Sequence, residues 1–126
     1  MHPALAVALG GGAGALTRFY LVVAMKRVDT EFPWGTLLVN VLGSFAIGAV
    51  WAWFLDRPDT PEWVRVGLMT GVLGGYTTLS SVSLETVLLL ESGAYWPALA
   101  NLAANFGLGL LACLAALWLF RPLFAA

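Results

Sequence analysis

The near absence of charge along three long apolar runs constrains this chain more than any other feature. Residues 33–55 and 97–119 contain no charged side chain, and residues 3–25 contain only Arg18. A helix needs about 20 predominantly apolar residues to cross a bilayer. Charged residues make up 10% of the chain, whereas soluble domains carry about 25%. We therefore expect lipid, not water, to surround most of the folded chain.

A fourth run, residues 62–91, is mainly apolar but is interrupted by Arg65 and Glu85. Prolines stand at positions 33, 61 and 97, where the first turn of a helix tolerates them. These features predict an all-α integral membrane protein of one domain, residues 1–126, in the inner (plasma) membrane. The four predicted transmembrane helices cover residues 3–25, 33–55, 62–91 and 97–119.

Basic residues barely distinguish the two sides of the membrane. With an even number of spans, Arg57, Arg65 and Arg121 lie on one side, whereas Lys26 and Arg27 lie on the other. Because cytoplasmic loops normally carry the excess of Lys and Arg, so small a difference predicts insertion in both orientations. Two oppositely oriented copies would form an antiparallel dimer, a symmetry that inverted-repeat transporters build within one chain.

The scarcity of charge and of reactive side chains argues against several functions. Lys and Arg form no cluster beyond Lys26 and Arg27, so no nucleic-acid partner is expected. Cys113 and His2 are the only residues of their types, so neither a metal cluster nor a nucleophile–base pair can be built from them. An enzyme is therefore not expected.

The first apolar run carries glycines and one charge. Gly10 and Gly14 have the GxxxG spacing that lets two helix backbones approach closely. A nucleotide-binding glycine loop is the alternative, but the spacing is not GxGxxG and no strand is expected before it. Arg18 has two interpretations: its side chain reaches the membrane surface, or it supplies positive charge to an anion vestibule.

Residues 74–78 suggest that the third helix is broken near the bilayer centre. Gly74 and Gly75 are followed by Tyr76, Thr77 and Thr78, in a run longer than one span requires. Irregular backbone at that depth survives only where protein or a cavity satisfies it. The freed carbonyls can bind a cation, and the new helix N-terminus favours an anion.

Hydroxyl side chains follow the expected break. Thr78, Ser81 and Glu85 are spaced i, i+3, i+7, so they share one helix face. Hydroxyl and helical N–H groups can donate hydrogen bonds to an anion in place of water. Glu85 lies about 12 Å along the helix from Thr77, which places it near a vestibule; a proton-coupling carboxylate is the alternative.

Amides inside a membrane need a partner or a polar path. In the second run Asn40 shares a face with Thr36 and Ser44, and in the fourth run Asn101 and Asn105 are spaced i, i+4. Each set has two interpretations, hydrogen bonds between helices or the lining of a pore. The residues themselves do not separate the two.

Taken together, the residues resemble the CrcB/Fluc family of fluoride channels over nearly the whole chain. Three family patterns occur in order: GGxxGAxxR, PxGTLxVNxxGSFxxG and GxxGGxTTFSTFSxE. They are matched by residues 10–18, 33–48 and 71–85. Each pattern alone is weak, whereas the three in order within so short a chain are highly specific.

The resemblance implies a passive fluoride-selective channel built as an antiparallel homodimer of dual topology. It also implies a structural Na⁺ at the dimer centre, held by the main-chain carbonyls of Gly74 and Thr77. Asn40 matches the family's pore-mouth asparagine, and Glu85 matches its conduction-linked glutamate. The implied fluoride pathway is completed by Thr78, Leu79, Ser80, Ser81, Val82, Ser83, Asn101 and Asn105.

Leu79 and Val82 depart from the third family pattern, which has phenylalanine at both positions. Those rings contact fluoride through their edges, and aliphatic side chains lack the positive edge of a ring. Three interpretations follow: hydroxyls and amides suffice for conduction, the subunit conducts poorly, or it pairs with a paralogous subunit. A non-conducting subunit of a heterodimeric channel is therefore one alternative function, and a small proton-coupled multidrug exporter that uses Glu85 is another.

Overall fold

The computed structural model describes residues 1–28 and 30–125, which form helices and the loops between them. Three helices are long: α1 (Pro3–Met25), α2 (Trp34–Leu55) and α6 (Tyr95–Ala125). The third predicted segment is divided into α3 (Glu62–Val66), η1 (Gly67–Leu73), α4 (Gly74–Tyr76) and α5 (Leu79–Glu91). The predicted all-α fold with a broken third helix is thereby confirmed.

Helices α1, α2 and α6 are each long and apolar enough to cross a membrane. The 31 residues of α6 extend about 46 Å, which exceeds the hydrocarbon core of about 30 Å. This helix continues through Pro122, because a proline in the last turn removes only one intrahelical hydrogen bond. The third predicted segment contains no continuous helix of that length, because it is divided at the break.

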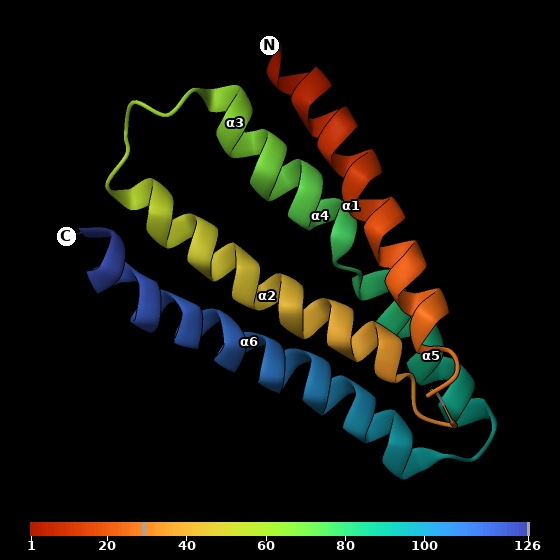
Figure 1. Ribbon diagram of the computed structural model, residues 1–126. Helices are drawn as coiled ribbons and strands as arrows, with labels where there is room; N and C mark the ends of the chain where they lie inside the picture. The colour runs from red at the N-terminus through yellow and green to blue at the C-terminus, as the bar shows by residue number, and fades with distance from the viewer. Residues whose placement is uncertain (29, 126) are drawn as a thin grey trace.

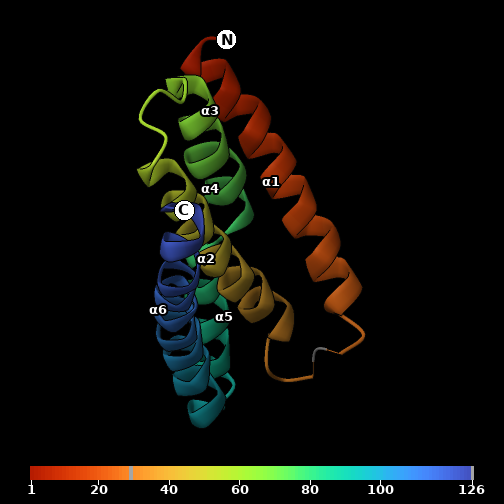
Figure 2. The same cartoon turned by 60° about the vertical axis from the view of Figure 1, so that its left-hand side comes forward.

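The third segment changes its neighbour at the break (Figure 1). Its upstream half, which comprises α3, η1 and α4, packs against α1, whereas α5 packs against α6. Helices α2 and α6 pack side by side along most of their length. Figure 2 shows α1 and α6 on opposite sides of the bundle, with the third segment between them. Each half therefore depends on a different partner helix.

The break falls on Thr77 and Thr78, just after the glycine pair. The ψ angle of Thr77 is 157° and the φ angle of Thr78 is −151°, so both residues are extended. Gly74 and Gly75 remain helical. The small size of Gly75 serves packing instead, since a Cβ on it would lie 2.5 Å from the carbonyl oxygen of Gly11.

Glycines also bring α1 and the upstream half together. A Cβ on Gly10 would lie 2.5 Å from the carbonyl oxygen of Gly67, and one on Gly14 would overlap the carbonyl of Val72. The GxxxG pattern of α1 is thus a helix-packing surface, and the residues lie within a continuous helix. Backbone touches backbone along this seam, which we call the glycine seam.

Large apolar side chains cover the outer surface of the bundle. Trp118 is 82% exposed, Trp96 is 81% exposed and Tyr95 is 67% exposed. Contiguous apolar surface of this extent marks contact with lipid or with another chain. Together with the long apolar helices, it fits a multi-pass protein of the cell membrane.

Candidate functional site

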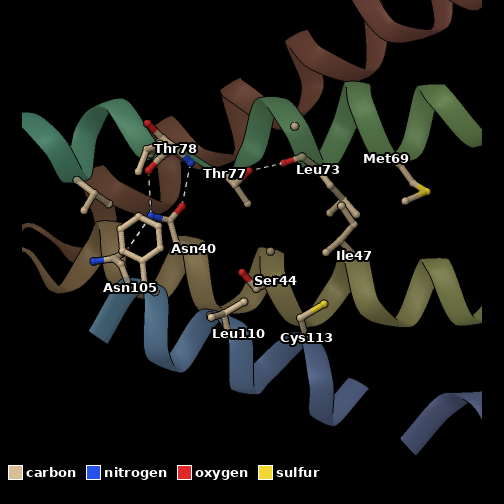
Figure 3. Close-up of a pocket in the computed structure, with 16 residues that line it drawn as sticks. Asn40, Ser44, Ile47, Met69, Leu73, Thr77, Thr78, Asn105, Leu110 and Cys113 are labelled. Atoms are coloured by element: carbon tan, nitrogen blue, oxygen red, sulfur yellow. Dashed lines mark hydrogen bonds between the residues drawn. The ribbon is translucent and has the colours of Figure 1, made fainter. Parts of the chain in front are cut away.

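A cavity of about 400 Å³ lies beside the break, between α2, the third segment and α6. Figure 3 shows polar groups gathered at one end, where Asn40, Thr78 and Asn105 meet, and Ile47 and Met69 at the other end. Ser44 lies between them. None of the 16 lining residues carries a charge.

Asn40 holds the broken backbone in place. Its Oδ1 accepts from the backbone N–H of Thr78 (2.8 Å), and its Nδ2 donates to the carbonyl oxygen of the same residue (3.0 Å). The hydroxyl of Thr78 in turn accepts from the N–H of Ser81 and caps α5. An amide of α2 therefore replaces the hydrogen bonds that the third helix gives up where it breaks.

The three asparagines form one continuous chain of hydrogen bonds. Nδ2 of Asn40 donates to Oδ1 of Asn105 (2.9 Å). Nδ2 of Asn105 donates to Oδ1 (2.9 Å) and to the backbone carbonyl (2.8 Å) of Asn101. Nδ2 of Asn101 donates to Oγ1 of Thr86 (3.1 Å), whose hydroxyl donates to the carbonyl of Val82 (2.7 Å). We call this chain, from Thr78 to Val82, the amide relay.

About half of the site residues that the sequence predicted line the cavity. Those that line it are Asn40, Gly74, Thr77, Thr78, Leu79, Val82 and Asn105. Asn101 is fully buried behind Asn105, and this position favours the hydrogen-bonding interpretation for it. Ser80 and Ser83 are exposed on α5, and Ser81 lies beside Thr78, whose hydroxyl donates to its Oγ (3.1 Å).

Glu85 lies away from the central cavity. Its Oε1 accepts a hydrogen bond from the hydroxyl of Thr36. The glutamate lines a second hollow of about 320 Å³ together with Glu31, Pro33 and Ser92. This hollow lies beyond the hydroxyl side chains of α5, and the vestibule role suggested by the helix spacing stays a prediction.

Arg18 turns toward the third helix. The side chain is half-buried, and its Nε donates to the carbonyl of Gly75 (3.3 Å). The guanidinium therefore brings positive charge to the last helical turn before the break. This hydrogen bond also makes the carbonyl of Gly75 less available to a cation at the break.

The positions of the two missing phenylalanines differ sharply. Leu79 is 63% exposed, whereas Val82 is 1% exposed and packed in the interior. Both line the cavity, and the one aromatic ring among its lining residues belongs to Phe106 of α6. An aromatic ring therefore borders the same cavity from another helix.

Sequence reasoning missed three residues of this site. Ser44 was noted only for sharing a face with Asn40, and that spacing was a usable signal. Phe106 directly follows Asn105, yet one aromatic in an apolar helix gives no signal of a site. Thr86 gives none either, because a threonine in a helix commonly bonds its own backbone.

The fold and the cavity define a small multi-pass membrane protein with an uncharged polar site at a helix break. Residues 5–117 match the family model described as "CrcB-like protein, Camphor Resistance (CrcB)". A Rhizobium meliloti protein named fluoride-specific ion channel FluC is 43% identical over 124 residues, 98% of this chain and 99% of that protein. The protein of the same name from Granulibacter bethesdensis is 46% identical over 120 residues, 94% of each chain.

A third relative of that name, from Caulobacter vibrioides, is 42% identical over 127 residues, 99% of this chain and 100% of that protein. This chain therefore belongs to the CrcB/FluC family of membrane proteins, a family of channels and not of enzymes. The family resemblance seen in the sequence motifs is confirmed.

Proposed function

We propose that this protein is a passive channel that lets fluoride leave the cytoplasm down its gradient. The observation that carries the proposal is family membership over nearly the whole chain, with relatives that are named fluoride-specific ion channels. The uncharged cavity beside the helix break supports it, because hydroxyl and amide groups can replace the water shell of a small anion. Fluoride enters cells as HF and ionises inside, so a passive channel lowers its internal level without energy input.

The proposed pathway runs along α5 from the cavity to the hollow at Glu85. Asn40, Thr78 and Asn105 would form its narrow end, and Arg18 would attract the anion toward the break. The hydroxyls of Ser80, Ser81 and Ser83 would continue the path toward Glu85. Leu79, Val82 and the buried Asn101 would shape its wall.

A second copy of the chain is the partner that we propose. Leu79 borders the cavity and is largely exposed, so a single chain leaves the cavity wall uncovered on that side. An antiparallel copy would cover it and enclose the path. The nearly balanced basic residues on the two membrane sides support that orientation.

The break also fits the proposed Na⁺ site. Because the N–H of Thr78 donates to Asn40, the carbonyl of Gly74 lacks the donor that a continuous helix would supply. Gly74 and Thr77 both border the cavity, and carbonyl oxygens are suitable ligands for a hard cation. Among the described residues no cluster of His, Cys, Asp or Glu could hold a metal. The two carbonyls of each subunit would therefore bind the ion, which would join the subunits at the dimer axis.

Fluoride efflux from liposomes that contain only the purified protein tests this function. A fluoride electrode should record fast release, and a chloride electrode should record none above empty liposomes. Replacement of Na⁺ by a large organic cation during purification should lower the recovery of dimer. Fluoride release no faster than from empty liposomes would refute a self-sufficient channel.

A non-conducting subunit of a heterodimer is the second candidate, because aliphatic side chains stand at positions 79 and 82. It predicts that flux is absent from the pure protein and appears after mixing with a paralogue. The proton-coupled exporter is less well supported, since such a protein needs a carboxylate in its binding cavity. The central cavity has none, and Glu85 lies in the other hollow.

A further inference from the structure

The amide relay begins and ends on the same helix. It starts at the backbone N–H of Thr78, the N-cap of α5, and passes through Asn40 of α2 and Asn105 and Asn101 of α6. It returns through Thr86 to the carbonyl of Val82, one turn into α5. One chain of donors thus ties the break to both packed helices.

Backbone groups fix the orientation of most members of the relay. A backbone N–H can only donate and a carbonyl can only accept. Asn40 contacts both of these groups of Thr78, and Asn105 donates to a carbonyl at 2.8 Å. Thr86 donates to the carbonyl of Val82, so its oxygen must accept. These three side chains therefore have one permitted orientation each.

Asn101 is the exception. Its amide lies 3.5 Å from the nearest backbone acceptor in the relay, the carbonyl of Val82, and its short donor contact is to Oγ1 of Thr86. Its Oδ1 is held from the other side, where it accepts from Nδ2 of Asn105 (2.9 Å). Without the oxygen of Thr86, the buried NH₂ of Asn101 would keep only its long contact with Val82. That amide would then shift or flip to find another acceptor, and a flip would place its NH₂ against the NH₂ of Asn105. Either change removes the side-chain acceptor of Asn105 and displaces Asn105 relative to Asn40.

We propose that Thr86 is a positioning residue for the conduction site. This proposal rests on the proposed channel function. Thr86 is 6% exposed and does not line the cavity. It holds the NH₂ of Asn101, and through Asn101 it supports the position in which Asn105 contacts Asn40 at the cavity. The hydroxyl of Thr86 therefore acts on the anion path indirectly, through the side-chain amides of Asn101 and Asn105.

The substitution Thr86→Val tests the proposal, because it keeps the shape and removes only the hydroxyl. We expect fluoride efflux to fall about tenfold, the scale of one unpaired buried donor, with a lower fluoride-to-chloride ratio. Thr86→Ser should restore both. Thr17→Val is the matched control, since Thr17 also donates to a carbonyl in its own helix (2.8 Å) but is exposed and outside the relay.

Asparagine side-chain NMR tests the relay without relying on flux. The chain contains three asparagines and no glutamine, so ¹⁵N-asparagine labelling shows the side-chain amides of the relay alone. In Thr86→Val the signals of Asn40 and Asn105 should shift together with those of Asn101, and in Thr17→Val none should. A change confined to Asn101 would overturn the proposal, even if the wild-type protein carried no fluoride.

Wild-type flux and selectivity in Thr86→Val would also overturn the proposal while leaving the channel function intact. If the valine variant does not fold, Thr86→Cys serves instead, because a thiol is a much weaker acceptor of similar size. The cysteine variant should show an intermediate loss of flux and the same shifts of Asn40 and Asn105. Wild-type behaviour in both measurements would reject the proposal equally.

Discussion

The two halves of the third segment are held by opposite kinds of contact. The upstream half is joined to α1 by the glycine seam, where main chains touch and side chains are nearly absent. The downstream half is joined to α2 and α6 by the amide relay, in which side chains make the contacts. The first kind of contact tolerates no added volume, and the second tolerates no lost hydrogen bond. Substitutions of size and of polarity should therefore separate the two halves.

The largest effect is expected where volume is added to the glycine seam. Gly14→Leu would force α1 away from the carbonyl of Val72, at a cost of about 3 kcal/mol or more. The yield of monodisperse protein in detergent and its thermal unfolding measure the loss. Gly12→Ala is the control, because a Cβ there has no neighbour within 4 Å. Equal stability of the two variants would show that the seam is not tightly packed.

Removal of the amide that holds the break comes next. Asn40→Leu leaves the N–H and carbonyl of Thr78 without their partners, each at a cost of about 1–3 kcal/mol. We expect at least a tenfold loss of fluoride efflux and a lower unfolding temperature. Asn40→Asp keeps the acceptor for the N–H but places an oxygen against the carbonyl of Thr78 and Oδ1 of Asn105, so it should not restore the stability. If Asn40→Leu conducts normally, another group must satisfy the break.

Phenylalanine, the residue of the family pattern, should have different effects at positions 79 and 82 of α5. Val82 is 1% exposed, so Val82→Phe overfills a packed site and should destabilise the protein by about 1–3 kcal/mol. Leu79 is 63% exposed, so Leu79→Phe should fold normally and raise fluoride efflux severalfold. Thermal unfolding and liposome efflux of both variants check this. Equal tolerance of the two rings would mean that the helix rotates in the assembled protein.

The smallest effect is expected at the ring on α6. Phe106→Leu removes the one aromatic side chain of the cavity lining and should lower fluoride efflux about twofold to fivefold, the effect of losing one weak contact between a ring and the anion. Phe106→Tyr keeps the ring and should preserve most of the flux. Phe19→Leu is the control, since Phe19 is an exposed ring of α1 outside the cavity. Unchanged efflux in Phe106→Leu would exclude a role for the ring.

The fold class was predictable because its signals are local. Long uncharged runs and the prolines before them depend only on neighbours in the sequence, and they identified the helices. The break near Thr77 and Thr78 was predictable for the same reason. The glycine pair before it also suggested the break, but both glycines remain helical. Gly75 instead allows close contact with Gly11 of α1, a long-range pair that no local pattern reveals.

The pairing of the polar groups was not predictable. Spacing placed Asn101 and Asn105 on one face of α6, but it did not indicate which helix that face meets. Asn40 and Thr78 are 38 residues apart, and the link from Thr86 to Asn101 also joins separate helices. Whether an amide lines a pore or bonds another helix is decided by such long-range pairs. Glu85 was easier to place, because distance along a helix follows directly from residue number.

The hydrogen bonds between Asn40 and Thr78 have a consequence for the order in which the helices come together. During synthesis α2 leaves the ribosome before the third segment, so the amide that satisfies the break is already made when Thr78 arrives, 38 residues later. The break can therefore enter the lipid without exposing bare peptide groups. Asn105 is made last, and the second bond of Asn40 must wait for it. We therefore expect a chain truncated before α6 to keep the contact between Asn40 and Thr78 and to lack only the one between Asn40 and Asn105.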